Sequence, residues 1–273
     1  MSRIKARFDA LKAANRAAFI PFISAGDPDA ATSAALLESL PGAGADLIEL
    51  GMPFTDPMAD GPAVQASSLR ALKSGATMAS TFDMVRGFRS KDIATPVILM
   101  GYFNPVHAWG AAKFAADAAA AGVDGLIIVD LPPEEDETLR TAANKAGIDM
   151  IRLVTPTTDA ARLGKVLNGA SGFLYYVSVA GVTGTKSFTE SDVRDALTRI
   201  RAASSLPVAV GFGIRTPEQA GSIAKFADAV VVGSAIVALA EAVGPAQLVA
   251  KTGELCRALA GSTHDARNDK VRA

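Results

Sequence analysis

The sequence predicts an α/β fold, a closed (β/α)₈ barrel of the TIM type with an extra helix at its N-terminus. The chain has 273 residues, a length that such barrels use as a single domain. About eight short apolar runs alternate with longer Ala-rich amphipathic stretches, and no break in composition divides them. Runs that are nearly continuous in Val, Ile and Leu are typical of parallel strands covered on both faces. An open doubly wound sheet is the alternative that the same alternation allows.

Expected strands and helices alternate along the chain. Residues 1–19 alternate charged and apolar side chains at helical spacing and lack the apolar core of a signal peptide. Strands are expected at 18–23, 46–50, 96–100, 124–129, 149–154, 173–179, 207–210 and 228–233. Helices are expected at 29–40, 81–89, 111–121, 134–146, 159–167, 190–203 and 217–227. We therefore expect one barrel domain over residues 1–260 and, because residues 261–273 are polar and charged, a disordered C-terminal tail.

Charge and cysteine content narrow the class of protein. The formal net charge is -1, from 27 basic and 28 acidic side chains, which gives no broad positive field for nucleic acid or for a membrane surface. No stretch approaches the roughly 20 apolar residues that span a bilayer. The single cysteine, Cys256, cannot form an internal disulfide and is expected to be a buried thiol. These features predict a cytoplasmic protein that binds neither nucleic acid nor a membrane.

Two Gly/Pro-rich connections are longer than the barrel pattern needs. They span residues 51–75, after the second expected strand, and 180–188, after the sixth. Long connections within a compact domain are usually functional. In barrels of this type the active site lies at the C-terminal ends of the strands, so we expect both connections to border it.

Glu49 stands inside the apolar run of the second strand. It could form an ion pair with a neighbouring strand, or it could point into the barrel mouth as a desolvated carboxyl group. Arg152 is the only basic residue within the expected strands, which favours the second interpretation. Apolar surroundings would then raise the pKa of Glu49 and suit it to proton transfer near neutral pH.

Asp60 supplies a second carboxylate from the connection that follows. It lies in Asp60-Gly61-Pro62, directly before a helix expected to start near Ala63. Aspartate at this position could cap that helix, or it could face Glu49 across the barrel mouth. The spacing alone leaves both interpretations open.

Glycines after three consecutive strands suggest a phosphate site. Gly211-Phe212-Gly213 follows the seventh expected strand, Gly233-Ser234 follows the eighth, and residues 181–186 (GVTGTK) follow the sixth. The last two loops of a barrel often hold phosphate through backbone N–H groups. Glycine also ends strands for reasons of packing, which remains the alternative.

Other chemistries find little support in the sequence. Only two histidines occur, His107 and His264, and no His/Asp/Cys cluster accompanies them, which disfavours a zinc or two-metal centre. No lysine lies in an expected strand, which argues against Schiff-base chemistry. A GxSxG elbow and a Walker loop are also absent. Acid–base catalysis by carboxyl groups, or no catalysis, remains.

Five segments together resemble one known family. They are PFISAGDP from Pro21, IELGMPFTDPMADGPAVQ from Ile48, YYVSVAGVTGTK from Tyr175, VAVGFGI from Val208 and DAVVVGSAIV from Asp228. The second is the most specific, because a strand-end Glu followed by DPxADGP is not a general feature of barrels. Over nearly its whole length the chain resembles the tryptophan synthase alpha family.

The resemblance implies the cleavage of indole-3-glycerol phosphate to indole and glyceraldehyde 3-phosphate, without a metal or an organic cofactor. It implies that Glu49 is the acid–base catalyst and that Asp60 holds the indole N–H. The positions that match the family's other substrate contacts are Phe22, Met100, Tyr175, Thr183, Gly184, Phe212, Gly213, Gly233 and Ser234. Met100 replaces a commoner Leu at nearly equal volume, and Thr55 keeps the hydroxyl of the family's usual Ser.

The resemblance also implies a partner, the pyridoxal-phosphate-dependent beta subunit, in an αββα complex. The matching interface positions are Asp56, Pro57, Asn104 and Pro132. Trp109, near the same rim with Pro105, could be an interface anchor or an ordinary packed side chain. Two other functions stay open: another phosphate-binding barrel lyase or isomerase, and a non-catalytic allosteric activator of a beta-type partner.

Overall fold

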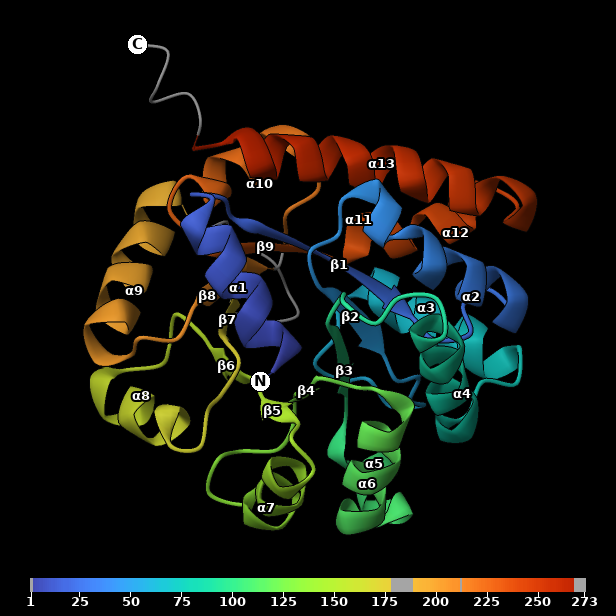
Figure 1. Cartoon of the computed structure of the whole chain (residues 1–273), viewed down its shortest axis with the longest axis horizontal. Helices are drawn as coiled ribbons and strands as arrows, with labels where there is room; N and C mark the ends of the chain where they lie inside the picture. Colours follow the sequence, from blue (N-terminus) through green and yellow to red (C-terminus); the bar gives the residue numbers. More distant parts are fainter. Residues whose placement is uncertain (1, 178–188, 212, 268–273) are drawn as a thin grey trace.

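The computed structural model describes residues 2–177, 189–211 and 213–267. Within these residues nine parallel strands form one sheet in the order β5-β4-β3-β2-β1-β9-β8-β7-β6 (Figure 1). The strands are β1 (Ala18–Ser24), β2 (Ile48–Gly51), β3 (Val97–Gly101), β4 (Gly125–Ile128), β5 (Asp149–Met150), β6 (Arg152–Val154), β7 (Leu174–Val177), β8 (Val208–Gly211) and β9 (Ala229–Val232). The two ends of this order, β5 and β6, are separated along the chain only by Ile151. They are two halves of one expected strand, so the sheet closes into the predicted eight-stranded barrel.

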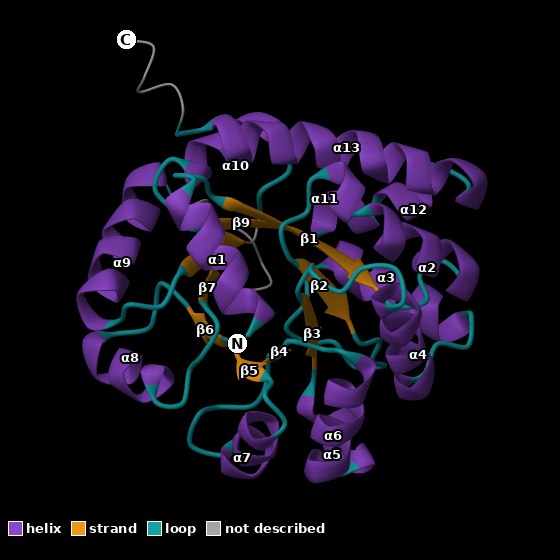
Figure 2. Cartoon of the chain, in the orientation of Figure 1, coloured by secondary structure: helices purple, strands orange, loops and turns teal. Residues whose placement is uncertain are grey.

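Helices surround the barrel (Figure 2). They are α1 (Arg3–Ala13), α2 (Ala30–Ser39), α3 (Pro62–Lys73), α4 (Met78–Arg89), α5 (Phe103–Trp109), α6 (Ala111–Ala121), α7 (Glu137–Lys145), α8 (Ala160–Leu167), α9 (Glu190–Ala203), α10 (Pro217–Ala224), α11 (Ser234–Val237), α12 (Leu239–Ala242) and α13 (Pro245–Asp265), with a 3-10 turn η1 (Pro41–Ala43). The seven expected helices all occur, with shifted ends. A helix is also expected to open at Gly233-Ser234, where α11 begins, whereas the sequence pattern missed α5, which contains a proline in its first turn, and the short α12. The connection expected over 51–75 is a loop only as far as Gly61, because α3 occupies most of the remainder.

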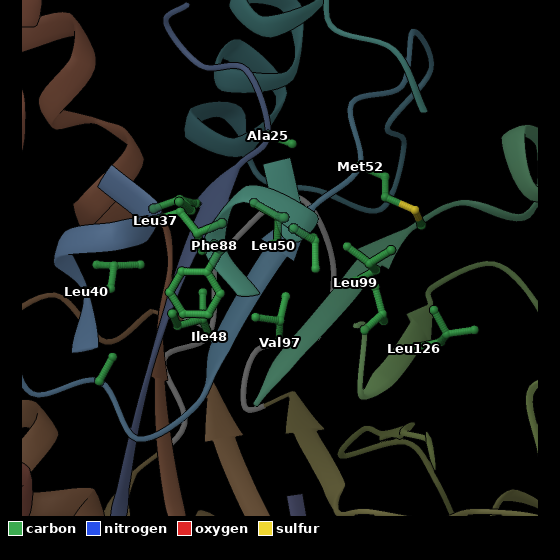
Figure 3. Close-up of a cluster of buried hydrophobic side chains, with 14 of the residues drawn as sticks. Ala25, Leu37, Leu40, Ile48, Leu50, Met52, Phe88, Val97, Leu99 and Leu126 are labelled. Atoms are coloured by element: carbon green, nitrogen blue, oxygen red, sulfur yellow. The ribbon is translucent and has the colours of Figure 1, made fainter. Parts of the chain in front are cut away.

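Side chains alternate between the two faces of each strand. On β2 and β3, Ile48, Leu50, Val97 and Leu99 face outward and pack with Leu37, Leu40 and Phe88 from the surrounding helices (Figure 3). Leu47 and Ile98 face inward with Ile20, Ile127, Phe173 and Tyr175. The inner and outer layers are therefore separate apolar cores, and a residue's place in the alternation decides which one it enters.

Helix α1 closes the N-terminal end of the barrel. Its Ile4, Phe8 and Leu11 are buried in the inner core, and the ring centroids of Phe8 and Phe173 lie 5.6 Å apart. Ser2 caps the helix and donates a hydrogen bond of 2.6 Å to Asp149 at the start of β5. With this end filled, the inner core of the described residues opens toward the C-terminal ends of the strands.

Aspartates at the starts of the strands tie this closed end together. Asp46, Asp124 and Asp228 precede β2, β4 and β9, and each accepts a backbone N–H from a neighbouring strand, at 2.8–2.9 Å. Asp124 also pairs with Arg3 of α1 and with Arg89 of α4, at 2.7 and 2.6 Å. These carboxylates therefore join neighbouring strands, and Asp124 also joins the sheet to two helices.

The C-terminal region differs from the expectation. Helix α13 continues to Asp265, so the expected disorder is wrong for residues 261–265, while residues 268–273 lie outside the described residues. The polar side chains that suggested disorder have partners in the fold. Thr263 is fully buried and donates to the carbonyl of Leu259 at 2.8 Å, and His264 lies 2.7 Å from Asp46. Composition alone could not show that a polar segment rests on the barrel.

Two further sequence expectations concern Cys256 and membrane-spanning segments. Cys256 is buried as predicted, and burial raises the pKa of its thiol to about 12. None of the described helices combines the length and the apolar character needed to cross a membrane.

The contact between His264 and Asp46 leads to a prediction about stability. We expect His264→Ala to lower the free energy of unfolding by about 1–2 kcal/mol, because Asp46 loses a partner in a mostly buried place. Urea denaturation measures this change. Asp265→Ala, an exposed neighbour on the same helix, is the control and should change stability by less than about 0.5 kcal/mol. Equal stability of His264→Ala and the wild type would contradict the anchoring of α13 through this pair.

Candidate active site

Glu49 points into the barrel, since it lies between the outward-facing Ile48 and Leu50. Its side chain is buried, and on β1 its register partner is Phe22. Burial, followed by the negative charge of Asp60, raises the pKa of Glu49 to about 8. Among the described residues no cation offsets this burial. Glu49 is therefore a carboxyl group that holds its proton at neutral pH.

Arg152, the one basic residue on a strand, does not reach Glu49. It lies on the outward side of β6 and forms an ion pair with the fully buried Asp136, which also pairs with Arg140 of α7 at 3.0 Å. The interpretation of Glu49 as an ion-paired strand residue is therefore wrong for the described part of the chain.

Asp60 is also buried, at the end of the loop that follows β2. The N-cap of α3 is Gly61, and no side chain caps this helix, so the capping interpretation of Asp60 is wrong. The hydroxyl of Tyr102 instead donates to Oδ2 of Asp60 at 3.1 Å. Burial raises the pKa of Asp60 to about 6, and the hydrogen bond from Tyr102 acts in the opposite direction. At neutral pH Asp60 is therefore mostly ionised.

Loop 52–61, which carries Asp60, is held at several points. The hydroxyl of Ser68 accepts from the N–H of Phe54 at 2.9 Å and donates to its carbonyl at 3.0 Å. Gln65 donates to the carbonyl of Asp60 at 2.8 Å, and the N–H of Ala59 donates to Tyr102 at 2.9 Å. Residues of α3 and of the end of β3 thus fix the position of the second acid.

The two acids line one pocket at the C-terminal end of the barrel. The other lining residues are mostly apolar or glycine: Phe22, Gly61, Val64, Met100, Tyr175, Gly213, Ile214, Val231, Gly233 and Ser234. Tyr175 enters from β7 on the inward side, and burial together with the two carboxyl groups raises the pKa of its hydroxyl. The pocket therefore has a buried acidic region beside an apolar wall and a glycine-rich rim.

Glycine is required in and next to this pocket for two different reasons. A Cβ at Gly51 would lie 2.7 Å from the ring of Phe22, so the absence of a side chain makes room for that aromatic wall. Gly213 has a φ of +85°, in the left-handed region that other residues rarely adopt. Packing thus explains some of the strand-end glycines, and the backbone turn after β8 explains another.

The structure brings together eight of the predicted site residues. Glu49, Asp60, Phe22, Met100, Tyr175, Gly213, Gly233 and Ser234 all line the pocket. The predicted contacts Thr183, Gly184 and Phe212 lie outside the described residues. The sequence missed Tyr102, although it directly follows the end of β3, where strand-end side chains meet the site. It also missed the apolar wall residues Val64, Ile214 and Val231.

The four expected interface positions lie on connections after neighbouring strands. Asp56 and Pro57 follow β2, Asn104 belongs to α5 after β3, and Pro132 follows β4. All of them except the half-buried Pro57 are exposed. Next to Pro57, Met58 is a large apolar side chain that is 75% exposed, which the sequence analysis did not single out.

Trp109, the other aromatic residue considered for this rim, is a packed side chain. Its indole N–H donates to Asp117 at 2.8 Å, and its ring packs edge-on against Phe82, with 5.8 Å between centroids. Of the two interpretations of Trp109, the structure supports ordinary packing.

Comparison with known proteins places the chain in a family. A family model described as tryptophan synthase alpha chain matches residues 8–264. The chain belongs to the tryptophan synthase alpha family. This family is the lyase half of tryptophan synthase, which cleaves indole-3-glycerol phosphate.

Solved structures agree with this assignment. Tryptophan synthase subunit alpha from Legionella pneumophila is 39% identical, with a TM-score of 0.88 over 98% of this chain and 99% of that chain. A tryptophan synthase structure from Mycobacterium tuberculosis is 38% identical, with a TM-score of 0.86 over 96% of this chain and 98% of that chain. A structure from Aquifex aeolicus is 33% identical, with a TM-score of 0.88 over 97% of this chain and 100% of that chain. The family's barrel is therefore shared over nearly the full length.

The raised pKa of Glu49 leads to a prediction about stability and pH. A carboxyl group whose pKa is higher in the folded state stabilises the fold fully below its unfolded pKa, and this contribution is lost as pH rises through the folded value. For Glu49 that window runs from about 4.5 to about 8. Glu49→Gln cannot ionise, so we expect its stability relative to the wild type to rise across this window by on the order of 4 kcal/mol.

Urea denaturation at several pH values between 4.5 and 8.5 measures this difference. Glu135→Gln, at an exposed position, is the matched control and should follow the wild-type profile. If the Glu49→Gln and wild-type profiles run parallel, Glu49 does not carry a raised pKa in the folded protein.

Proposed function

We propose that this pocket cleaves indole-3-glycerol phosphate to indole and glyceraldehyde 3-phosphate, with Glu49 as acid and base and Asp60 as a fixed negative charge. The observation that carries this proposal is the pair of unlike, buried carboxyl groups in one pocket. Their pKa values of about 8 and about 6 leave Glu49 protonated and Asp60 ionised at neutral pH. Environments that separate two pKa values in this way assign acid and base roles.

The reaction requires a proton before the carbon–carbon bond breaks. Direct cleavage would leave a poor aryl carbanion on indole C3. When Glu49 protonates C3, the ring becomes an iminium-like cation whose nitrogen can accept the bonding electrons. The Glu49 carboxylate then removes the proton of the hydroxyl on the carbon attached to C3, and that carbon leaves as an aldehyde. One residue thus gives a proton and takes one back, and its pKa near the working pH suits both steps.

Asp60 would stabilise the intermediate cation. Its carboxylate is the hydrogen-bond acceptor for the indole N–H, where positive charge develops after C3 is protonated. Tyr102 orients this carboxylate and favours its ionised form. In a site that excludes water such an interaction contributes about 2–4 kcal/mol to the stabilisation of the transition state.

Phe22, Met100 and Tyr175 would hold the apolar indole ring, since they form the wall around Glu49. The phosphate would lie at the glycine-rich rim. Among the described lining residues there is no Lys or Arg, so backbone N–H groups would bind the phosphate, as loops after the last strands of barrels often do. By the family resemblance the contributing residues are Gly184, Gly213, Gly233 and Ser234, with Phe212 beside them and Thr183 on the connection after β7. The two ends of the substrate would thus be fixed separately, which orients the bond to be broken.

A beta subunit is the proposed partner, with pyridoxal phosphate bound in that subunit and none in this chain. Asp56, Pro57, Asn104 and Pro132 lie on connections at the same end of the barrel as the pocket, and the exposed Met58 adds apolar surface to the first of them. Indole is apolar, so a partner docked at the pocket mouth would receive it without release into water. The cleavage itself uses only side-chain acids and bases.

An assay with indole-3-glycerol phosphate tests the proposed reaction. We expect the purified chain to form indole, to form it faster with a beta subunit present, and to lose turnover by at least about a hundredfold in Glu49→Gln. Indole release is followed by absorbance, and circular dichroism confirms that the variant is folded. Glu135→Gln serves again as the exposed control. Turnover by Glu49→Gln close to that of the wild type would remove Glu49 from the chemistry.

Tyr102→Phe tests how the ionisation of Asp60 is maintained. The variant loses the hydrogen bond that lowers the pKa of Asp60, so this pKa should rise above about 6. We expect activity near pH 6.5 to fall about threefold to tenfold, and to recover partly toward pH 8, where Asp60 is ionised again. The measurement is the pH dependence of kcat/KM. A uniform loss at every pH would show that Tyr102 contributes only by packing.

A further inference from the structure

Arg70 joins α3 to two segments that lie far from it in the sequence, the connection after β1 and the consecutive helices α11 and α12. Its Nε and Nη2 atoms donate to the two carboxylate oxygens of Asp27 at 2.7 and 2.9 Å. Nη2 also donates to the carbonyl of Val237 at 3.2 Å, and Nη1 donates to Glu241 at 2.8 Å. A single guanidinium group thus contacts the connection after β1, the last residue of α11 and the short helix α12.

Each of these segments supports a different part of the pocket. Helix α3 begins directly after Asp60 and Gly61, so it carries the acid proposed to hold the indole. Helix α11 begins at Ser234 and ends at Val237, so it carries the rim proposed to hold the phosphate. Asp27 lies just beyond β1, the strand that supplies Phe22. Arg70 therefore connects the elements that carry the two ends of the site. We call its contacts with Asp27, Val237 and Glu241 the Arg70 bridge.

In the Arg70 bridge the contact with Asp27 is mostly buried, whereas the contact with Glu241 is exposed to solvent. The side chain of Asp27 is 5% exposed and that of Arg70 24%, while that of Glu241 is 59% exposed. The contact with Asp27 is bidentate, a geometry that fixes direction as well as distance. An ion pair of this kind holds its partners at a defined separation more firmly than a surface pair does.

We propose that Arg70 is a positioning residue that sets the separation between the indole end and the phosphate end of the pocket. The proposal rests on the proposed function, because it needs a substrate that is held at both ends. Arg70 does not line the pocket among the described residues, so it acts through α3 and α11 rather than by touching the substrate.

Two substitutions loosen the bridge by different amounts. Arg70→Lys keeps the charge, but a single ammonium group cannot bind Asp27 bidentately and also reach Val237 and Glu241. Glu241→Ala removes only the exposed contact between Arg70 and Glu241 and should leave the fold unchanged. Lys73→Met, an exposed position on the same helix, is the matched control.

The experiment compares a ligand held at both ends with one held at a single end. For Arg70→Lys we expect the KM for indole-3-glycerol phosphate to rise about tenfold, and for Glu241→Ala about threefold, with smaller losses in kcat. The Kd of glyceraldehyde 3-phosphate, measured by calorimetry, should stay within twofold of the wild-type value, because this product occupies only the phosphate end. Lys73→Met should match the wild type in both measurements.

Other outcomes would overturn the proposal. If Arg70→Lys lowers the Tm but leaves the KM within twofold, the bridge is only structural. If the KM and the Kd of glyceraldehyde 3-phosphate rise together, Arg70 shapes the phosphate end alone. Should Arg70→Lys not fold, an unchanged KM in Glu241→Ala decides against the proposal. A wild-type chain that binds glyceraldehyde 3-phosphate but forms no indole would instead refute the proposed function.

Discussion

The burial of Glu49 inside the barrel, with no cation beside it in the described structure, is the constraint on which the rest of the site depends. A carboxyl group in such a place is stable only while it keeps its proton, and a second acid nearby strengthens that requirement. The inner core, closed at one end by α1, supplies the apolar surroundings. Glu49 is therefore a proton donor because apolar side chains surround it inside the barrel, and not because of one particular hydrogen bond.

The second acid needs a different environment, and the structure provides one. If Asp60 also stayed neutral, the pocket would hold two proton donors and no anion for a developing cation. Tyr102 counteracts the effect of burial on the pKa of Asp60 by donating to it, and the contacts of Ser68 and Gln65 with loop 52–61 keep the carboxylate in place. The difference between the two acids thus arises from the less complete burial of Asp60 and from the Tyr102 hydroxyl group, which donates to Asp60.

Sequence patterns could predict the parts of this site that depend on local order. Apolar runs located the strands, and the absence of basic residues on them, apart from Arg152, correctly favoured an unpaired Glu49. The position of Asp60 could not be decided in this way, because its partner Tyr102 is 42 residues away. For the same reason the sequence wrongly predicts disorder for residues 261–265, because the partner of His264 is the distant Asp46. The Arg70 bridge likewise arises from tertiary contacts that leave no local periodicity.

Carboxyl groups at the two ends of the barrel have different surroundings and different roles. At the N-terminal end Asp46, Asp124 and Asp228 are each satisfied by a backbone N–H and by a basic or histidine side chain. At the C-terminal end Glu49 and Asp60 lack such cationic partners among the described residues, and both pKa values are raised. Carboxyl groups thus join elements at one end of the barrel and are the groups proposed to react at the other. Because hydrogen bonds and ion pairs at the closed end already join strands to one another and to helices, Glu49 and Asp60 are not needed to hold the sheet together and can serve the proposed reaction.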